Sequence, residues 1–120
     1  MMPATYNLEY YRGDDLRFIL IPKDSSGAPL DLSAATPTFT ISTGRGDSPV
    51  SPGAGFPATI QCTASTIDSN TKIECIITQQ NGLDMKAGTL YVYDVAISSG
   101  GSVTTYLTGN VNVTERVVAP

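Results

Sequence analysis

The stretch TLYVYDVAISSGGSVTTYLTGNVNVT, residues 89–114, decides the fold class of this chain. Apolar and polar side chains alternate through 89–98 and again through 102–114, which is the period of a β-strand with one buried face. SGG at 99–101 lies between the two segments, and glycine accepts the positive φ of a tight turn. The stretch therefore predicts a β-hairpin.

Similar alternation recurs along the rest of the chain. Strands are expected in 5–11, 14–24, 30–42, 58–66 and 71–78, with IDSN as a hairpin turn between the last two. Only 79–88 could form a helical turn. About seven or eight strands with turn residues between them are typical of a single antiparallel β-sandwich of the immunoglobulin-like type. With 120 residues, the chain is expected to form one domain, 1–120.

The alternation also predicts the core, because residues two apart on a strand share a face. The expected inward side chains are Leu16, Phe18, Leu20, Phe39, Ile41, Ile60, Ile73, Ile77, Tyr91, Tyr93, Val95, Leu107, Val111 and Val113.

Composition restricts the classes of function. The net charge is −4 and the seven Lys and Arg residues are scattered, so we expect no binding to nucleic acid and no basic membrane anchor. No apolar run approaches the roughly 20 residues of a membrane-spanning helix. The start of the chain lacks the pattern of a signal peptide, which predicts synthesis and folding in a cytoplasm.

The residues do not suggest an enzyme. Histidine, the usual general base near neutral pH, is absent. Asp94 lies out of phase with the apolar residues of its strand and is expected to point outward. No nucleophile motif, phosphate-binding glycine loop or calcium loop is present. We therefore expect no catalytic residues, no metal and no cofactor.

Cys62 and Cys75 fall on the same face as the isoleucines of the predicted 58–78 hairpin. If that hairpin turns on Asp68 and Ser69, the two cysteines lie opposite each other, within the Cα separation of a disulfide. A slip in register would separate them. The alternatives are a disulfide and two buried free thiols, and a reducing compartment favours the thiols.

Four motifs follow one another along the chain. They consist of Tyr11, Gly13, Asp14, Leu16 and Phe18; Asp24, Gly27, Pro29, Leu30, Asp31, Leu32 and Ala35; Ala87, Gly88, Tyr91, Tyr93 and Asp94; and Leu107, Gly109, Val111, Val113 and Thr114. In this order the motifs resemble those of a family of small phage virion β-sandwich domains. The family includes the amino-terminal domain of baseplate upper proteins and small tail proteins of actinobacterial phages. The sequence departs from the family at 43–57, where the family usually has a shorter connection.

The resemblance implies a structural role in the virion, in the tail or baseplate or on the capsid. The expected partners are other virion proteins and copies of this chain. Ile19 and Ile21 point away from the predicted core and are candidates for a subunit contact. A loop or the amino-terminal strand could instead cover them.

GRGDSP at 44–49 is the integrin-binding sequence of fibronectin, and a second RGD lies at 12–14. The first is expected to belong to the fold, as a strand entry with a tight turn at Gly13. The second lies in a Gly- and Pro-rich loop, 43–57, where Arg45, Gly46, Asp47 and Ser48 could be presented to a partner. An adhesion module is therefore the alternative function. We do not expect integrin binding, because glycine, aspartate, serine and proline are ordinary loop residues.

Overall fold

The computed structural model describes residues 4–23, 26–46, 49–115 and 117. In chain order the elements are β1 (Ala4–Thr5), β2 (Leu8–Tyr11), β3 (Leu16–Leu20), β4 (Thr36–Ser42), β5 (Thr59–Ile67), β6 (Lys72–Ile77), α1 (Gln79–Leu83), β7 (Leu90–Ser99) and β8 (Ser102–Thr114). Strand and bridge residues make up 55% of the described residues, and helical residues 5%. Since an average globular protein is about a third helical, the all-β expectation and its single short helical turn are confirmed.

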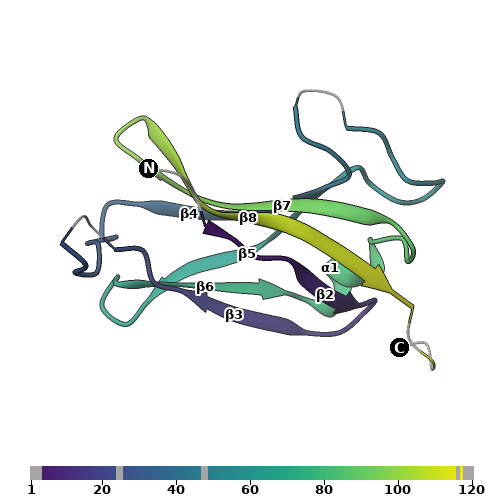
Figure 1. Cartoon of the computed structure of the whole chain (residues 1–120), viewed down its shortest axis with the longest axis horizontal. Helices are drawn as coiled ribbons and strands as arrows, with labels where there is room; N and C mark the ends of the chain where they lie inside the picture. The colour runs from purple at the N-terminus through teal and green to yellow at the C-terminus, as the bar shows by residue number, and fades with distance from the viewer. Residues whose placement is uncertain (1–3, 24–25, 47–48, 116, 118–120) are drawn as a thin grey trace.

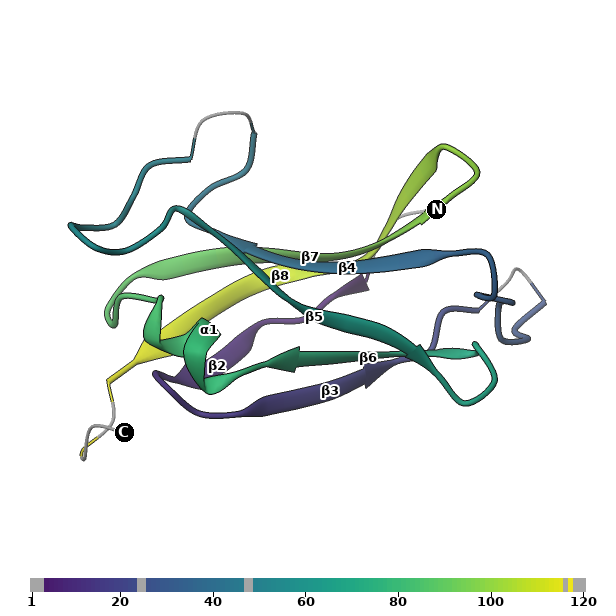
Figure 2. The same ribbon diagram turned by 180° about the vertical axis from the view of Figure 1, so that it is seen from behind.

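The strands form one curled sheet in the order β1-β8-β7-β4-β5-β6-β3, and β2 also pairs with β8. Strand β5 makes the curl, because its first residues pair with β4 and its last residues pair with β6. Strands β6 and β3 consequently lie across from β4, β7 and β8, with the core between them (Figures 1 and 2).

The sheet is mixed, and the expectation of a wholly antiparallel arrangement was wrong. Both β1 and β2 run parallel to β8, with Leu8 opposite Val111 and Tyr10 opposite Val113. Alternation along 5–11 showed which side chains face inward, but it carries no information on the direction of the partner strand. The first and last strands of the domain therefore lie side by side.

Most of the predicted core is buried. Every predicted core residue on β4 to β8 is at most 7% exposed. The three on β3, Leu16, Phe18 and Leu20, are only partly buried and pack against the core, because β3 lies at the end of the strand order. Six further core residues were absent from the predicted set: Leu8, Tyr10, Leu32, Cys75, Met85 and Ile97.

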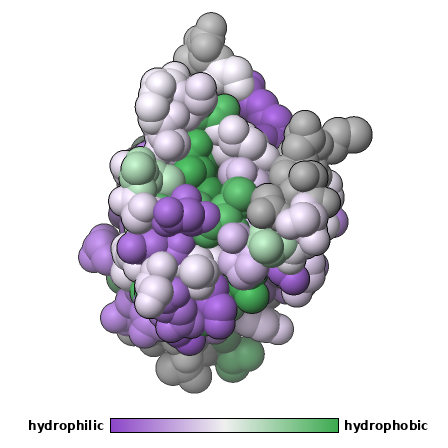
Figure 3. Space-filling view, turned by 90° about the vertical axis from the view of Figure 1, so that its left-hand side faces the viewer, coloured by the Kyte–Doolittle hydropathy of each residue, from purple (hydrophilic) through white to green (hydrophobic). Residues whose placement is uncertain are grey.

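Aromatic rings connect the two sides of the curled sheet. The Phe39 ring on β4 contacts Phe18 of β3 at a centroid distance of 5.4 Å and Tyr93 of β7 at 5.8 Å, both edge to face. At the end of the domain shown in Figure 3, apolar side chains are visible along the middle of the surface, between more polar residues on either side. Some apolar side chains are therefore exposed at this end, although each core residue is at most 7% exposed.

Two strands are shorter than predicted. Strand β3 covers 16–20 rather than 14–24, and β4 begins at Thr36 rather than at residue 30. The segment before β4 is fixed by other contacts, since the Leu32 N–H donates to the Asn70 carbonyl and its side chain is buried. Apolar periodicity cannot distinguish a buried irregular segment of this kind from a strand.

The short helix α1 is held at both ends. Thr78 and Asn81 form a reciprocal capping box at its start, and the Asp15 carboxylate accepts from the Gln79 N–H at 3.0 Å. At Gly82 a Cβ atom would lie 1.9 Å from the Tyr10 hydroxyl oxygen. The helix therefore packs against the end of β2, next to the turn at 12–14.

Candidate functional site

Ile19 on β3 and Ile21, the residue just after this strand, are exposed on its outer side, at 43% and 40%. Arg17 lies on the same side of the strand and forms an ion pair with Glu74 of β6. We call Arg17, Ile19 and Ile21 the β3 outer row. The amino-terminal strand does not cover this row, because β1 and β2 pair with β8 at the other end of the strand order.

The β3 outer row also borders an open sheet edge. Among the described residues, β3 pairs with β6 on one side and with no strand on the other. Backbone N–H and C=O groups on such an edge can pair with another chain. The exposure of the two isoleucines agrees with the sequence expectation, while the subunit contact itself stays a prediction.

The RGD at 12–14 is built into the fold. The Arg12 guanidinium donates to the carbonyl oxygens of Met85 at 2.8 Å and Leu83 at 2.9 Å, and it lies 5.8 Å from the centre of the Phe56 ring. Gly13 has a φ of 87°, which favours glycine. Arg12 therefore binds the carbonyl groups just after helix α1 and is not presented to solvent as a ligand.

Arg45, in the second RGD, is bound to the domain's own sheet. Its guanidinium donates to the Asp94 carboxylate at 2.7 Å and to the Thr108 hydroxyl at 2.5 Å, and Thr108 also donates to Asp94 at 2.7 Å. Asp94 thus points outward, as its position in the alternation predicted. Gly46 is exposed with a φ of 100°. Asp47 and Ser48 lie outside the described residues.

Other described parts of the 43–57 loop are fixed by hydrogen bonds, either within the loop or to the rest of the domain. The Lys86 ammonium donates to the Pro52 carbonyl at 3.3 Å, the Ser51 hydroxyl donates to the Phe56 carbonyl at 2.6 Å, and the Thr43 N–H donates to the Ala58 carbonyl. The described part of the loop is therefore held by contacts within the chain.

The predicted register of the cysteine hairpin was wrong by two residues. The turn contains Asp68, Ser69 and Asn70, all with positive φ, so Cys75 pairs with Ala64 rather than with Cys62. Turn length sets hairpin register, and the turn spans 68–71 rather than 68–69, which was not evident from the sequence. Both cysteines are free.

Burial controls the ionisation of the thiols and of two tyrosines. Desolvation raises the pKa of each cysteine from 9.0 to about 12. It also raises the pKa of Tyr10 and of Tyr93 from 10.0 to about 12. The thiols are therefore protonated at neutral pH, whereas a reactive cysteine needs a lowered pKa. In the part of the chain that the structure describes, no group of His, Cys, Asp or Glu could hold a metal ion.

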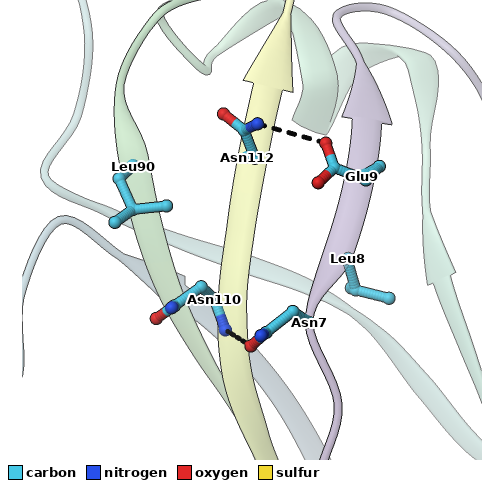
Figure 4. Close-up of a pocket in the computed structure, with 6 residues that line it drawn as sticks. All are labelled: Asn7, Leu8, Glu9, Leu90, Asn110 and Asn112. Carbon is cyan, nitrogen blue, oxygen red and sulfur yellow. Dashed lines mark hydrogen bonds between the residues drawn. The ribbon is translucent and has the colours of Figure 1, made fainter.

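An open hollow of about 420 Å³ lies on the outer face of the sheet, across β2, β8 and β7 (Figure 4). Asn7, Leu8, Glu9, Leu90, Asn110 and Asn112 line it. The Asn7 side-chain oxygen accepts from the Asn110 backbone N–H at 3.1 Å, and the Asn112 amide donates to the Glu9 carboxylate at 3.1 Å. The parallel pairing of β2 with β8 brings these residues together.

Sequence reasoning did not identify this hollow. The available signal was asparagine at alternate positions in GNVNV, 109–113, together with YNLEY, 6–10. Asparagine is depleted in strands, so its repeated use at outward positions is informative. The parallel pairing that joins the two segments could not be read from either one alone.

No protein-family model matches the chain, and no curated protein matches it. Among the described residues, none of the helices has the length and apolar character needed to cross a membrane.

Proposed function

We propose that this chain is a structural component of a phage virion, an immunoglobulin-like β-sandwich in the tail or baseplate or on the capsid. It acts through contacts with other virion proteins and with copies of itself, and it is not an enzyme. The observation that carries the proposal is the β3 outer row, where two exposed isoleucines adjoin an open strand edge. The family resemblance of the four sequence motifs supports the same role.

The β3 outer row can contribute only a limited hydrophobic free energy to association with a partner. Ile19 and Ile21 are already more than half buried within the domain, so covering the remainder contributes about 1–3 kcal/mol of hydrophobic free energy. That is less than the cost of association. Pairing of the open β3 edge with a strand of the partner must therefore supply much of the affinity and the specificity.

The alternative, an adhesion module that presents GRGDSP, is less well supported. Presentation requires a free arginine, whereas Arg45 is bound to Asp94 and Thr108. We therefore place the function in protein–protein contacts of the sheet and not in this loop.

The contact is tested with the double variant Ile19→Lys/Ile21→Glu. We expect the variant to keep the circular dichroism spectrum of the wild type and to lose its concentration-dependent association in sedimentation velocity. The matched control is Val50→Glu/Val103→Lys, which makes the same kinds of charge change at valines 77% and 71% exposed and away from β3. Unchanged association of the Ile19/Ile21 variant would refute the contact, and an unfolded variant would assign both residues to the core.

The virion role is tested separately. An antibody against the purified chain should detect it in gradient-purified particles of the phage that encodes it, at a fixed ratio to the major capsid protein. Its absence from particles that contain all other structural proteins would overturn the proposal.

A further inference from the structure

We propose that the hollow across β2, β8 and β7 is a binding site for a short neutral oligosaccharide (Figure 4). Nothing in the virion role requires this site, and its evidence is independent of the β3 outer row. The argument rests on an unusual set of polar side chains and on an exposed leucine beside them.

Hydrogen bonds within the domain explain only some of the asparagine side chains that line the hollow. Asn7 supports β8 through the backbone of Asn110, and Asn112 is paired with Glu9. Within the described residues, the side-chain amide of Asn110 makes no hydrogen bond, although asparagine is a poor strand former. A threonine or valine would suit this strand position better, so the amide group is free to serve a ligand.

The hydrogen-bonding groups match hydroxyl groups. A sugar hydroxyl both donates and accepts, and it is best recognised by donors and acceptors placed close together. The Asn110 amide offers both, while Asn112 offers its carbonyl oxygen and Glu9 its second carboxylate oxygen. Glu9 is the one charged residue in the lining. Its negative charge disfavours phosphate and carboxylate ligands and leaves neutral polyols favoured.

Apolar groups beside the hollow match the C–H face of a sugar ring. Leu90 of β7 is 58% exposed and borders the hollow next to the asparagines. Tyr11 of β2 is 56% exposed and lies two residues after Glu9, on the same side of the strand. A sugar ring placed over Leu90, with further rings of the glycan extending across β8 towards Tyr11, would contact both groups. The hollow is open, so it suits a short stretch of a longer glycan rather than an enclosed monosaccharide.

The test is an ¹⁵N–¹H correlation titration with the trisaccharides of glucose, mannose, galactose and N-acetylglucosamine. Additions continue to about 20 mM, well above the ~1 mM dissociation constant expected of a shallow open site. At least one trisaccharide should shift the amide signals of 7–11, 90–92 and 109–113. Sorbitol, which has hydroxyl groups and no ring face, should shift them much less.

Asn110→Ala removes the unpaired amide without removing a hydrogen bond of the fold, and it should weaken binding by about fivefold or more. Thr38→Ala, which changes an exposed residue of β4 on the same sheet, should leave binding unchanged. Four outcomes would overturn the proposal: no shift with any of the trisaccharides, shifts located elsewhere, equal binding by Asn110→Ala, or shifts that disappear with EDTA and return with Ca²⁺ alone.

Discussion

The Arg45 guanidinium donates a 2.7 Å hydrogen bond to the carboxylate of Asp94, which lies 49 positions later in the chain. Through this contact the arginine of GRGDSP is directed onto β7 and β8 of its own domain. The same tripeptide at 12–14 is bound to backbone carbonyl groups through Arg12. Two identical RGD sequences thus have two different structural roles in one fold.

The Arg45–Asp94 pair predicts that the folded protein does not support RGD-dependent cell adhesion. Cells plated on the intact domain should attach no better than on Asp94→Ala or on an uncoated surface, and free RGD peptide should have no effect. A synthetic peptide covering 44–49 is the positive control, because it lacks Asp94. Peptide-blockable attachment to the intact domain would show that Arg45 leaves Asp94 readily.

Arg12→Ala should destabilise the domain by about 2–3 kcal/mol. The Arg12 side chain is only 22% exposed, and its loss leaves the carbonyl groups of Leu83 and Met85 without their charged donor. The matched control is Arg45→Ala, which removes a largely exposed ion pair and should cost less than about 1 kcal/mol. Urea unfolding followed by circular dichroism measures both, and equal losses would contradict the structural role of Arg12.

Gly109→Ala should destabilise the domain by more than about 2 kcal/mol, because β1 and β2 pass very close to β8 at this position. A Cβ atom on Gly109 would lie 2.0 Å from the Tyr6 carbonyl oxygen, which also accepts from the Tyr93 hydroxyl at 2.6 Å. Either the strand pair must separate or the buried Tyr93 loses its partner.

The control for this substitution is Gly44→Ala, where no atom lies within 4 Å of the added Cβ and no unusual φ is required. It should be neutral or slightly stabilising, since alanine reduces the entropy of the unfolded chain. Thermal unfolding compares the two variants. A Gly109→Ala protein as stable as Gly44→Ala would mean that the close approach of Tyr6 is absent in solution.

Raised thiol pKa values predict a loss of stability in alkali. In the folded protein the Cys62 and Cys75 thiols ionise with a pKa of about 12, whereas in the unfolded chain they ionise with a pKa of 9.0. Their stabilising contribution is therefore complete below pH 9 and is lost as the pH rises from 9 towards 12. The buried hydroxyl groups of Tyr10 and Tyr93 act in the same direction above pH 10.

Urea midpoints measured between pH 7 and pH 11 test this dependence. In the Cys62→Ala/Cys75→Ala variant, the urea midpoint should fall less steeply above pH 9 than in the wild type. The fall that remains in the variant should come from the tyrosines. At pH 8 the native thiols should also react with a thiol reagent far more slowly than in urea. Rapid reaction of both thiols in the native protein would contradict their burial.

Much of the fold could be predicted from the sequence. Period-two alternation in 89–114 identified β7, β8 and the side chains that they bury, and the glycines at 100 and 101 identified the turn between them. These are local properties, because the period of a strand and the φ of a turn depend on neighbouring residues. The outward orientation of Asp94, Ile19 and Ile21 followed from the same rule.

Only the tertiary structure decided which strands are neighbours and which polar groups meet. The parallel pairing of β2 with β8 brings Asn7 and Glu9 beside Asn110 and Asn112, and the curl at β5 determines the partners of Cys62 and Cys75. Alternation reports the face of a residue but not its partner across the sheet. The partner depends on how the whole chain buries its apolar area, a property that no single segment carries.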